Sequence, residues 1–221
     1  MLFGLGKRAA EKEIGFRDQN RNLVLYRYGT DKQDLPLLAG SRIRVRENQY
    51  IVFMSGGQVA DVWDKGLYLL TEAYFPILAE RISFAERPLK AELYFLNTAP
   101  VTEHKWATRT PALLRDETGM HQVRAYGTYD FRIQDSILFM MEAFIRRGLK
   151  DTQELTAFLL SLVAGAFSAS LSDLRMPVTE VINHAWQLSG PVRARADRLA
   201  AEMGLEILNV NIEGASLPDT R

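Results

Sequence analysis

Apolar and polar side chains alternate along thirteen consecutive residues, 121–133, and this feature limits the possible folds more than any other in the chain. The apolar positions are Val123, Ala125, Gly127, Tyr129, Phe131 and Ile133. Because successive side chains of a β-strand point to opposite faces, a period of two over this length predicts one long strand. One face of that strand is expected to lie on a core, and the other to be wet or only lightly covered.

A second β signal lies within residues 47–70. An apolar run at 50–54 is followed by Gly56 and Gly57 and then by a further apolar run that ends near residue 63. A two-residue hairpin turn of the mirror-image type needs positive φ at both central positions, which glycine adopts without steric cost. A second reversal at 64–66, ending in Gly66, predicts a small antiparallel meander in which these glycines serve backbone geometry.

The other periodic segments set the fold class. Further strands are expected at 23–28, 41–46, 91–97, 101–108 and 205–212, with a short one at 112–114. Helical periods begin at Asp135 or Ser136, at about Asp151, at Pro177 and at Gly190, and one or two helical turns are expected at Pro76. Strands come first, helices follow, and one strand returns, which is the α+β pattern of an antiparallel sheet with its helices on one side or end.

Charge and cysteine content exclude several function classes. The 221 residues include 27 basic and 27 acidic side chains, so the formal net charge is zero. A balanced chain without a basic cluster creates no field that attracts phosphate backbones, so nucleic acid is not expected as a partner. The chain has no cysteine, which excludes disulfides, thiol nucleophiles and thiolate metal sites and fits a cytosolic protein.

The N-terminus carries a candidate membrane contact. Met1, Leu2, Phe3 and Leu5 precede the first basic residues, which is the reverse of a secretory signal. Two interpretations remain open: a loosely packed start of the chain, or a shallow apolar anchor that enters a bilayer or a groove. No apolar run reaches the length of a membrane span, and the nearest candidate, 155–171, is interrupted by Ser and Thr and has the period of a packed helix.

Side chains that could carry chemistry are scattered along the sequence. His104, His121 and His184 show no metal-ligand spacing. The close acidic pairs are Asp61 with Asp64 and Asp116 with Glu117, and both pairs are expected at turns where each aspartate caps its own backbone. Gly56 and Gly57 lack the spacing of a phosphate loop. The sequence therefore predicts no catalytic, metal or cofactor site, and no enzyme.

The three tryptophans are expected mainly in cores or interfaces. Trp106 has polar neighbours and is the one expected to be partly exposed, whereas Trp63 and Trp186 are expected to be more buried.

With these segments in view, the chain resembles the SPFH family, also called the band 7 or prohibitin-homology domain, and is most similar to its bacterial virion-core-protein-like branch. The resemblance covers roughly residues 23–218 in the order of the family. The segments that carry it are 45–53, 56–59, Gly66, 93–98, 105–108, 123–131 and 204–211.

The resemblance implies a strongly curved antiparallel sheet with packed helices, in a domain that assembles side by side at membranes. Relatives such as stomatins, prohibitins and flotillins are scaffolds without catalytic residues to transfer. This sequence differs in having no N-terminal membrane hairpin, no long coiled coil after the domain and no C-terminal cysteine pairs. These differences predict a short family member, or a chain that ends before its oligomerising tail.

The sequence leaves three functions open. The first is a non-enzymatic scaffold, cytoplasmic and peripheral to the inner membrane, with an N-terminal segment at 1–22, a domain at 23–218 and a tail at 219–221. Its expected partners are further copies of itself, a membrane protein and peripheral lipid. The second is a soluble protein- or peptide-binding adaptor linked to proteolysis or stress response, and the third is a hydrolase with an undetected site among the acidic pairs and histidines.

Overall fold

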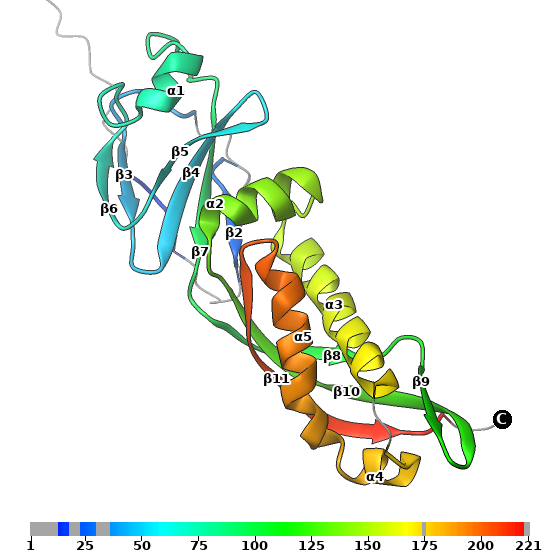
Figure 1. Ribbon diagram of the computed structural model, residues 1–221. Helices are drawn as coiled ribbons and strands as arrows, with labels where there is room; N and C mark the ends of the chain where they lie inside the picture. Colours follow the sequence, from blue (N-terminus) through cyan, green and yellow to red (C-terminus); the bar gives the residue numbers. More distant parts are fainter. Residues whose placement is uncertain (1–12, 18–22, 30–35, 174–175, 219–221) are drawn as a thin grey trace, which may run out of the picture. The chain divides into compact units, whose positions relative to one another are not determined.

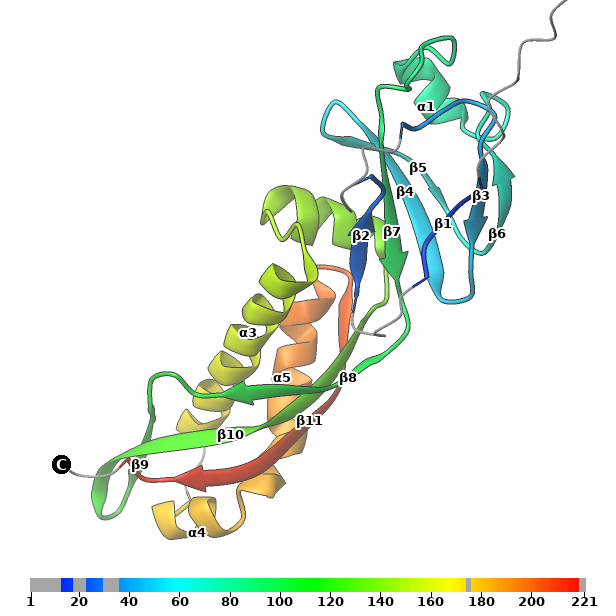
Figure 2. The same ribbon diagram turned by 180° about the vertical axis from the view of Figure 1, so that it is seen from behind.

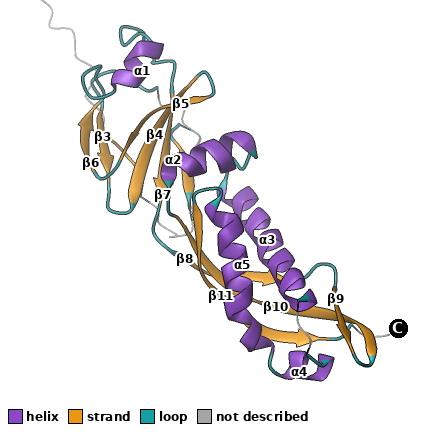
Figure 3. Cartoon of the chain, viewed as in Figure 1, coloured by secondary structure: helices purple, strands orange, loops and turns teal. Residues whose placement is uncertain are grey.

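The computed structural model describes residues 13–17, 23–29, 36–173 and 176–218 (Figure 1). The chain divides into two compact units, Met1–Thr98 and Ala99–Arg221. The long helices belong to the second unit, as Figure 3 shows by colour. The α+β class, with antiparallel sheets and helices mainly in the C-terminal half, is therefore confirmed, although the strands are distributed over three sheets. The expected domain limits at 22/23 and 218/219 stay predictions.

The first unit holds two small sheets. One has the order β1 (Glu13–Gly15), β3 (Arg42–Val45), β6 (Gly66–Leu69), with β1 and β3 parallel. The other has the order β2 (Leu25–Arg27), β7 (Glu92–Asn97), β4 (Gln49–Ser55), β5 (Gln58–Trp63), and its strands are antiparallel. The predicted meander is therefore wrong in its last step: β6 follows the hairpin in sequence but pairs with β3. Turn chemistry predicted the reversal but carried no information on the partner strand.

The β4–β5 hairpin turns at Gly56 and Gly57, whose φ angles are 58° and 75°. Ser55 faces Gln58 across this turn. Because both central residues have positive φ, the turn is of the mirror-image type that matches the twist of the flanking strands.

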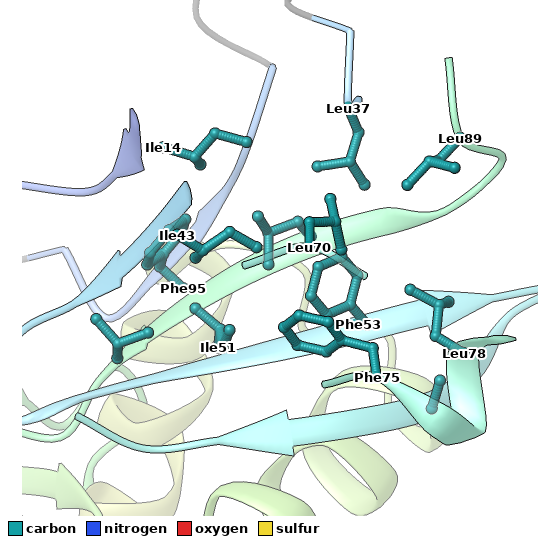
Figure 4. Close-up of a cluster of buried hydrophobic side chains, with 13 residues drawn as sticks. Ile14, Leu37, Ile43, Ile51, Phe53, Leu70, Phe75, Leu78, Leu89 and Phe95 are labelled. Carbon is teal, nitrogen blue, oxygen red and sulfur yellow. The ribbon is translucent and has the colours of Figure 1, made fainter. Parts of the chain in front are cut away.

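Aromatic and branched aliphatic side chains fill the core of the first unit (Figure 4). The rings of Phe53 and Phe75 are both fully buried and meet edge to face, with 4.7 Å between centroids. Phe75 directly precedes α1 (Pro76–Arg81), and Leu78 from that helix is also fully buried in the cluster. Apolar burial of this kind fixes the short helix against the strands.

The second unit is organised around the predicted long strand. β10 (Gly119–Ile133) pairs with β11 (Leu205–Ser216) along one side. Its other side pairs with β9 (Ala112–Asp116) near its start and with β8 (Val101–Ala107) near its end, and all these pairs are antiparallel. The burial of β10 alternates strictly from residue 123 onward, so the prediction of one buried face is confirmed.

Helices cover one face of this sheet. The strands are followed by α2 (Ser136–Leu138), the π-helix η1 (Phe139–Arg146), α3 (Thr152–Ser172), α4 (Val178–Asn183), the 3-10 helix η2 (Ala185–Leu188) and α5 (Ser189–Ala201). Figure 1 shows α3 and α5 side by side over the sheet, and Figure 2 shows the opposite face of β8, β10 and β11 without a helix. The predicted caps are present, since Asp135 accepts from Ile137 N and Leu138 N, and Asp151 accepts from Glu154 N. The π-helix was not predicted.

The tryptophan predictions are wrong for two residues. Trp106 is only 2% exposed, because its side chain lies under the helical layer and its ring packs 5.7 Å from that of Phe167. Trp186, in η2, is 62% exposed. Of its polar neighbours, only Lys105 lies on the exposed face of β8, whereas His104 is half-buried and Thr108 is buried, so the polarity of these residues says nothing about the environment of the indole.

In the part of the chain that the structure describes, α3 is the one helix long and apolar enough to cross a membrane by length and composition. Its buried side chains, among them Leu155, Leu159, Val163 and Phe167, pack within the second unit. The core helix of a soluble domain meets the same two criteria.

Candidate functional site

A pocket with a cavity volume of about 430 Å³ lies where the β9–β10 turn approaches the start of α4. It is lined by Arg115, Asp116, Glu117, Thr118, Met176 and Pro177. This pocket contains Asp116 and Glu117, one of the two acidic pairs that the sequence offered as candidates.

Asp116 is the centre of the hydrogen bonds in this region. Its Oδ1 accepts from the backbone N of Thr118 at 2.8 Å and from the Thr118 hydroxyl at 2.6 Å. Its Oδ2 accepts from the backbone N of Val178 at 2.9 Å. Asp116 therefore caps the turn of its own hairpin, as predicted, and also ties that hairpin to the first residue of α4, which was not predicted.

The same contacts keep Asp116 ionised. The Thr118 hydroxyl and the Val178 amide both donate to the charged form of the carboxylate, which lowers the pKa of Asp116 well below its usual range. A carboxylate held in this state does not take up a proton near neutral pH. It is unsuited to act as a general acid or base, which requires a pKa near the working pH.

His121 joins this cluster through one ring nitrogen. Its Nε2 lies 2.9 Å from Asp116 Oδ1 and 2.8 Å from the Thr118 hydroxyl. In a hydrolytic triad, the imidazole bridges the carboxylate and the nucleophilic hydroxyl through its two different nitrogens. Here both groups meet the same nitrogen, so Asp116, His121 and Thr118 form a structural clamp and not a proton relay.

Asp61 has a different role from the one the sequence suggested. It lies within β5 and not at a turn, it is 4% exposed, and its Oδ2 accepts from the backbone N of Leu78 at 2.7 Å. Burial raises the pKa of Asp61, while the amides of Leu78 and Ile77 oppose that shift. The prediction that Asp61 caps its own backbone is wrong: the carboxylate caps the first turn of α1, a helix that has no side-chain cap of its own.

The remaining candidates lie apart from one another. Asp64 is exposed at the turn between β5 and β6, where its carbonyl accepts from the Tyr68 hydroxyl at 3.0 Å. His104 packs against the rings of Tyr129 and Phe131, and burial lowers its pKa. His184 is exposed at the end of α4. Among the residues described, no group of three or more His, Asp or Glu side chains is placed to hold a metal ion.

The predicted structural glycines and the N-terminal contact have different outcomes. A Cβ on Gly66 would lie 2.6 Å from the Tyr68 hydroxyl, so this glycine makes room for the ring that packs beside it. Met1, Leu2, Phe3 and Leu5 lie outside the described residues, and the membrane contact they would make stays a prediction.

The grouping of Asp116 with His121 was not predicted, because the two residues do not have the spacing of a metal site or of neighbours on one helix face. The sequence did contain a signal for this grouping. Residues 116–119 form the turn between two antiparallel strands, and in such a hairpin a residue at the end of the first strand lies close to one near the start of the second. Thr118 and Val178 carried no sequence signal of their own.

Comparison with known proteins agrees with this architecture. The family model of the SPFH domain-Band 7 family matches residues 25–220. This match covers most of the chain, so the chain belongs to the SPFH domain-Band 7 family, whose members are typically membrane-associated and generally serve as non-enzymatic scaffolds. The assignment to the virion-core-protein-like branch stays a prediction.

A relative in Bacillus subtilis (strain 168), the uncharacterized protein YdjI, is 30% identical over 143 residues. The match covers 62% of this chain and 41% of YdjI. The matched part of this chain thus spans less than half the length of that relative.

Proposed function

We propose that the chain is a non-enzymatic scaffold that associates with the cytoplasmic face of the inner membrane, binds further copies of itself and recruits partner proteins there. The match to the SPFH domain-Band 7 family over residues 25–220 carries this proposal. The lipid contact is assigned to Met1, Leu2, Phe3 and Leu5, whose apolar side chains precede the first basic residues.

The acidic and histidine side chains support a non-enzymatic role. Asp61 is committed to α1, and Asp116 is committed to the β9–β10 turn and to α4. Each carboxylate accepts a hydrogen bond from a backbone amide of another secondary-structure element, and such a bond stabilises the fold. A group used in this way cannot leave its partners during a reaction without loosening the element that it holds.

The sheet edges of the second unit favour self-association through helices. On β11, the amides of Ile207 and Ile212 donate to Asp197 Oδ1 at 2.9 Å and to the Ser189 hydroxyl at 3.1 Å, both on α5. On β8, Glu103 has a positive φ of 60°, which kinks this strand, and its amide donates to the side chain of Asp130 on the paired strand β10. Occupied amides and a local kink both oppose the addition of another strand.

Co-sedimentation with vesicles of phosphatidylethanolamine and phosphatidylglycerol tests the membrane part of the proposal. We expect the full chain to pellet with the vesicles, and a Phe3→Ser/Leu5→Ser variant to remain largely in the supernatant. A matched control is Leu113→Ser, which changes an exposed apolar residue of β9 and should pellet as the parent does. Equal pelleting of all three proteins would contradict the assigned lipid contact, and no pelleting of the parent would contradict membrane association itself.

The pocket beside α4 favours a second candidate, a soluble adaptor that binds a peptide. Its open lining combines the charged side chains of Arg115 and Glu117 with the apolar surfaces of Met176 and Pro177. Affinity capture with the full chain, compared with an Arg115→Ala/Glu117→Ala variant, tests this function. A single soluble partner that the variant loses, together with no lipid dependence, would favour the adaptor over the scaffold.

A further inference from the structure

The helix formed by α2 and η1 leaves a stripe of apolar side chains uncovered. Ile137, Met141 and Ile145 follow one another at intervals of four residues and are 56%, 49% and 41% exposed. The opposite side of the same helix is buried through Phe139, Met140, Ala143 and Phe144. A surface helix normally places polar residues on its outer face, so three large apolar residues in one line indicate that something covers them.

The order of residues along this helix is symmetric about Met141. Ile137 and Ile145 lie four positions to either side of it, and Asp135 and Arg147 lie six positions to either side. When two copies of a helix pair in antiparallel fashion about a two-fold axis, residues at equal distances from the axis meet each other. Ile137 would then contact Ile145 of the second copy, and Asp135 would approach Arg147 of the second copy.

From this symmetry we infer that the stripe is the contact for a second copy of this chain. The contact is an antiparallel pair of α2–η1 helices with Met141 on the two-fold axis. This inference rests on the self-association in the proposed function and names the surface that performs it. Antiparallel pairing also brings the positive end of each helix dipole close to the negative end of the other.

Charge at the ends of the stripe favours a second copy over a lipid surface. An acidic residue, Asp135, begins the helix, and a basic residue, Arg147, follows it. The other charged pair of the helix, Glu142 and Arg146, is already joined by an ion pair of 2.9 Å. A helix that binds an anionic membrane carries basic residues along its whole length. This helix has one acidic end and one basic end, and in an antiparallel pair each end lies beside the oppositely charged end of the second copy.

The guanidinium that ends the stripe has a defined position. Arg147 lies over the ring of Phe158 in α3, with 5.3 Å from its central carbon to the ring centroid. The preceding eight residues are in a π-helix, a rare conformation that is found frequently at functional sites. Gly148 then ends the helix with a φ of 72°.

The size of the contact predicts its strength. Three half-exposed side chains per copy fall well short of the roughly 800 Å² per partner that a stable interface buries. The pair is therefore weak in dilute solution and forms when copies are concentrated, as they would be on a membrane surface.

Cysteine cross-linking tests the geometry directly, because the native chain has no cysteine. On the two-fold axis, the Cα atoms of residue 141 approach within the range of a disulfide. Residue 137 lies about two helical turns along the axis from its own counterpart, since eight residues separate positions 137 and 145, and a disulfide cannot span that distance. Met141→Cys should therefore form a dimer on mild oxidation, and Ile137→Cys alone should not, whereas a mixture of Ile137→Cys with Ile145→Cys should.

The control is Leu199→Cys, which exposes a thiol at a comparably exposed position, 44%, on α5. On vesicles of phosphatidylethanolamine and phosphatidylglycerol, and in concentrated solution, Met141→Cys should cross-link on the order of tenfold faster than this control. Adding Arg147→Glu to Met141→Cys should slow the reaction, while adding Arg198→Glu, on α5, should not. Melting curves identify any variant that fails to fold.

Equal rates for Met141→Cys and Leu199→Cys, or efficient cross-linking of Ile137→Cys with itself, would overturn the inferred pair. If that occurs while the parent still forms oligomers, the proposed function stands and this surface is wrong. If the parent remains monomeric on vesicles and in concentrated solution, the self-association part of the proposed function fails with it.

Discussion

Replacement of Gly127 by alanine tests how closely β10 and β11 approach each other. Gly127 lies in the middle of β10, and the indole N–H of Trp106 on the neighbouring strand donates to the Asn211 carbonyl of β11 at 3.4 Å. A Cβ at position 127 would lie 1.9 Å from that carbonyl oxygen and 3.1 Å from the backbone N of Glu213. Side-chain rearrangement cannot relieve this contact because both atoms belong to the backbone.

The size of the effect follows from the displacement that is required. Real Cβ contacts essentially never fall below 3.0 Å, so the carbonyl must move by at least 1.1 Å, the difference between 3.0 Å and 1.9 Å. Such overpacking costs typically up to about 3 kcal/mol, whereas an unhindered glycine-to-alanine change in a strand would stabilise by roughly 0.5–1 kcal/mol. We therefore expect Gly127→Ala to lower the free energy of unfolding by about 2 kcal/mol, which is the overpacking cost less the gain from alanine.

Urea unfolding followed by tryptophan fluorescence and circular dichroism measures this change. Gly165→Ala is the matched control: Gly165 lies inside α3 with open space around it. Since alanine has the higher helix propensity, this variant should gain up to about 1 kcal/mol. A Gly127→Ala protein as stable as the parent would refute the close approach of the two strands.

Three further changes test other contacts. Asp61→Ala should cost about 1–2 kcal/mol by removing the cap of α1, while Asp64→Ala, at an exposed turn, should change stability by less than about 0.5 kcal/mol in thermal melts. Burial lowers the pKa of His104, so the unfolded chain binds a proton near pH 6.5 before the folded chain does, and stability should fall as the pH drops below that value. Unfolding titrations should show a smaller decrease for His104→Gln, and an unchanged pH dependence would count against the buried environment. Trp106→Ala should cost about 3–5 kcal/mol, whereas Trp186→Ala should be nearly neutral, and the reverse order in urea titrations would contradict the assignment of the buried indole.

Elements defined by local patterns could be predicted from the sequence. The alternation at 121–133 corresponds to β10, because the period of two is a property of the strand itself. Asp135 and Asp151 begin helices as predicted, since a cap depends on amides only two or three residues away.

Features that depend on distant residues could not be predicted in this way. β6 pairs with β3 and not with the strand just before it, and Asp61 caps a helix that begins fifteen residues later in the sequence. The burial of Trp106 depends on Phe167 of α3. In each case the deciding contact is made by a residue that no local window contains.

The candidate site shows the same division. The turn at Asp116 could be predicted from its residues, and so could its hydrogen bonds to Thr118. Its bond to Val178 joins residues 62 positions apart, and the placement of His121 beside it depends on the register of β9 and β10. Register follows from the whole pattern of paired side chains. The clamp of Asp116, Thr118 and His121 can therefore be recognised only in the folded structure.

Sedimentation velocity of the full chain, measured at increasing concentration alone and with small vesicles of phosphatidylethanolamine and phosphatidylglycerol, tests the central claim most directly. A scaffold of this family should bind the vesicles and should form species of multiples of 25.1 kDa, the mass of one chain, at the higher concentrations. A chain that stays at 25.1 kDa at every concentration and does not bind the vesicles would contradict both membrane association and self-association.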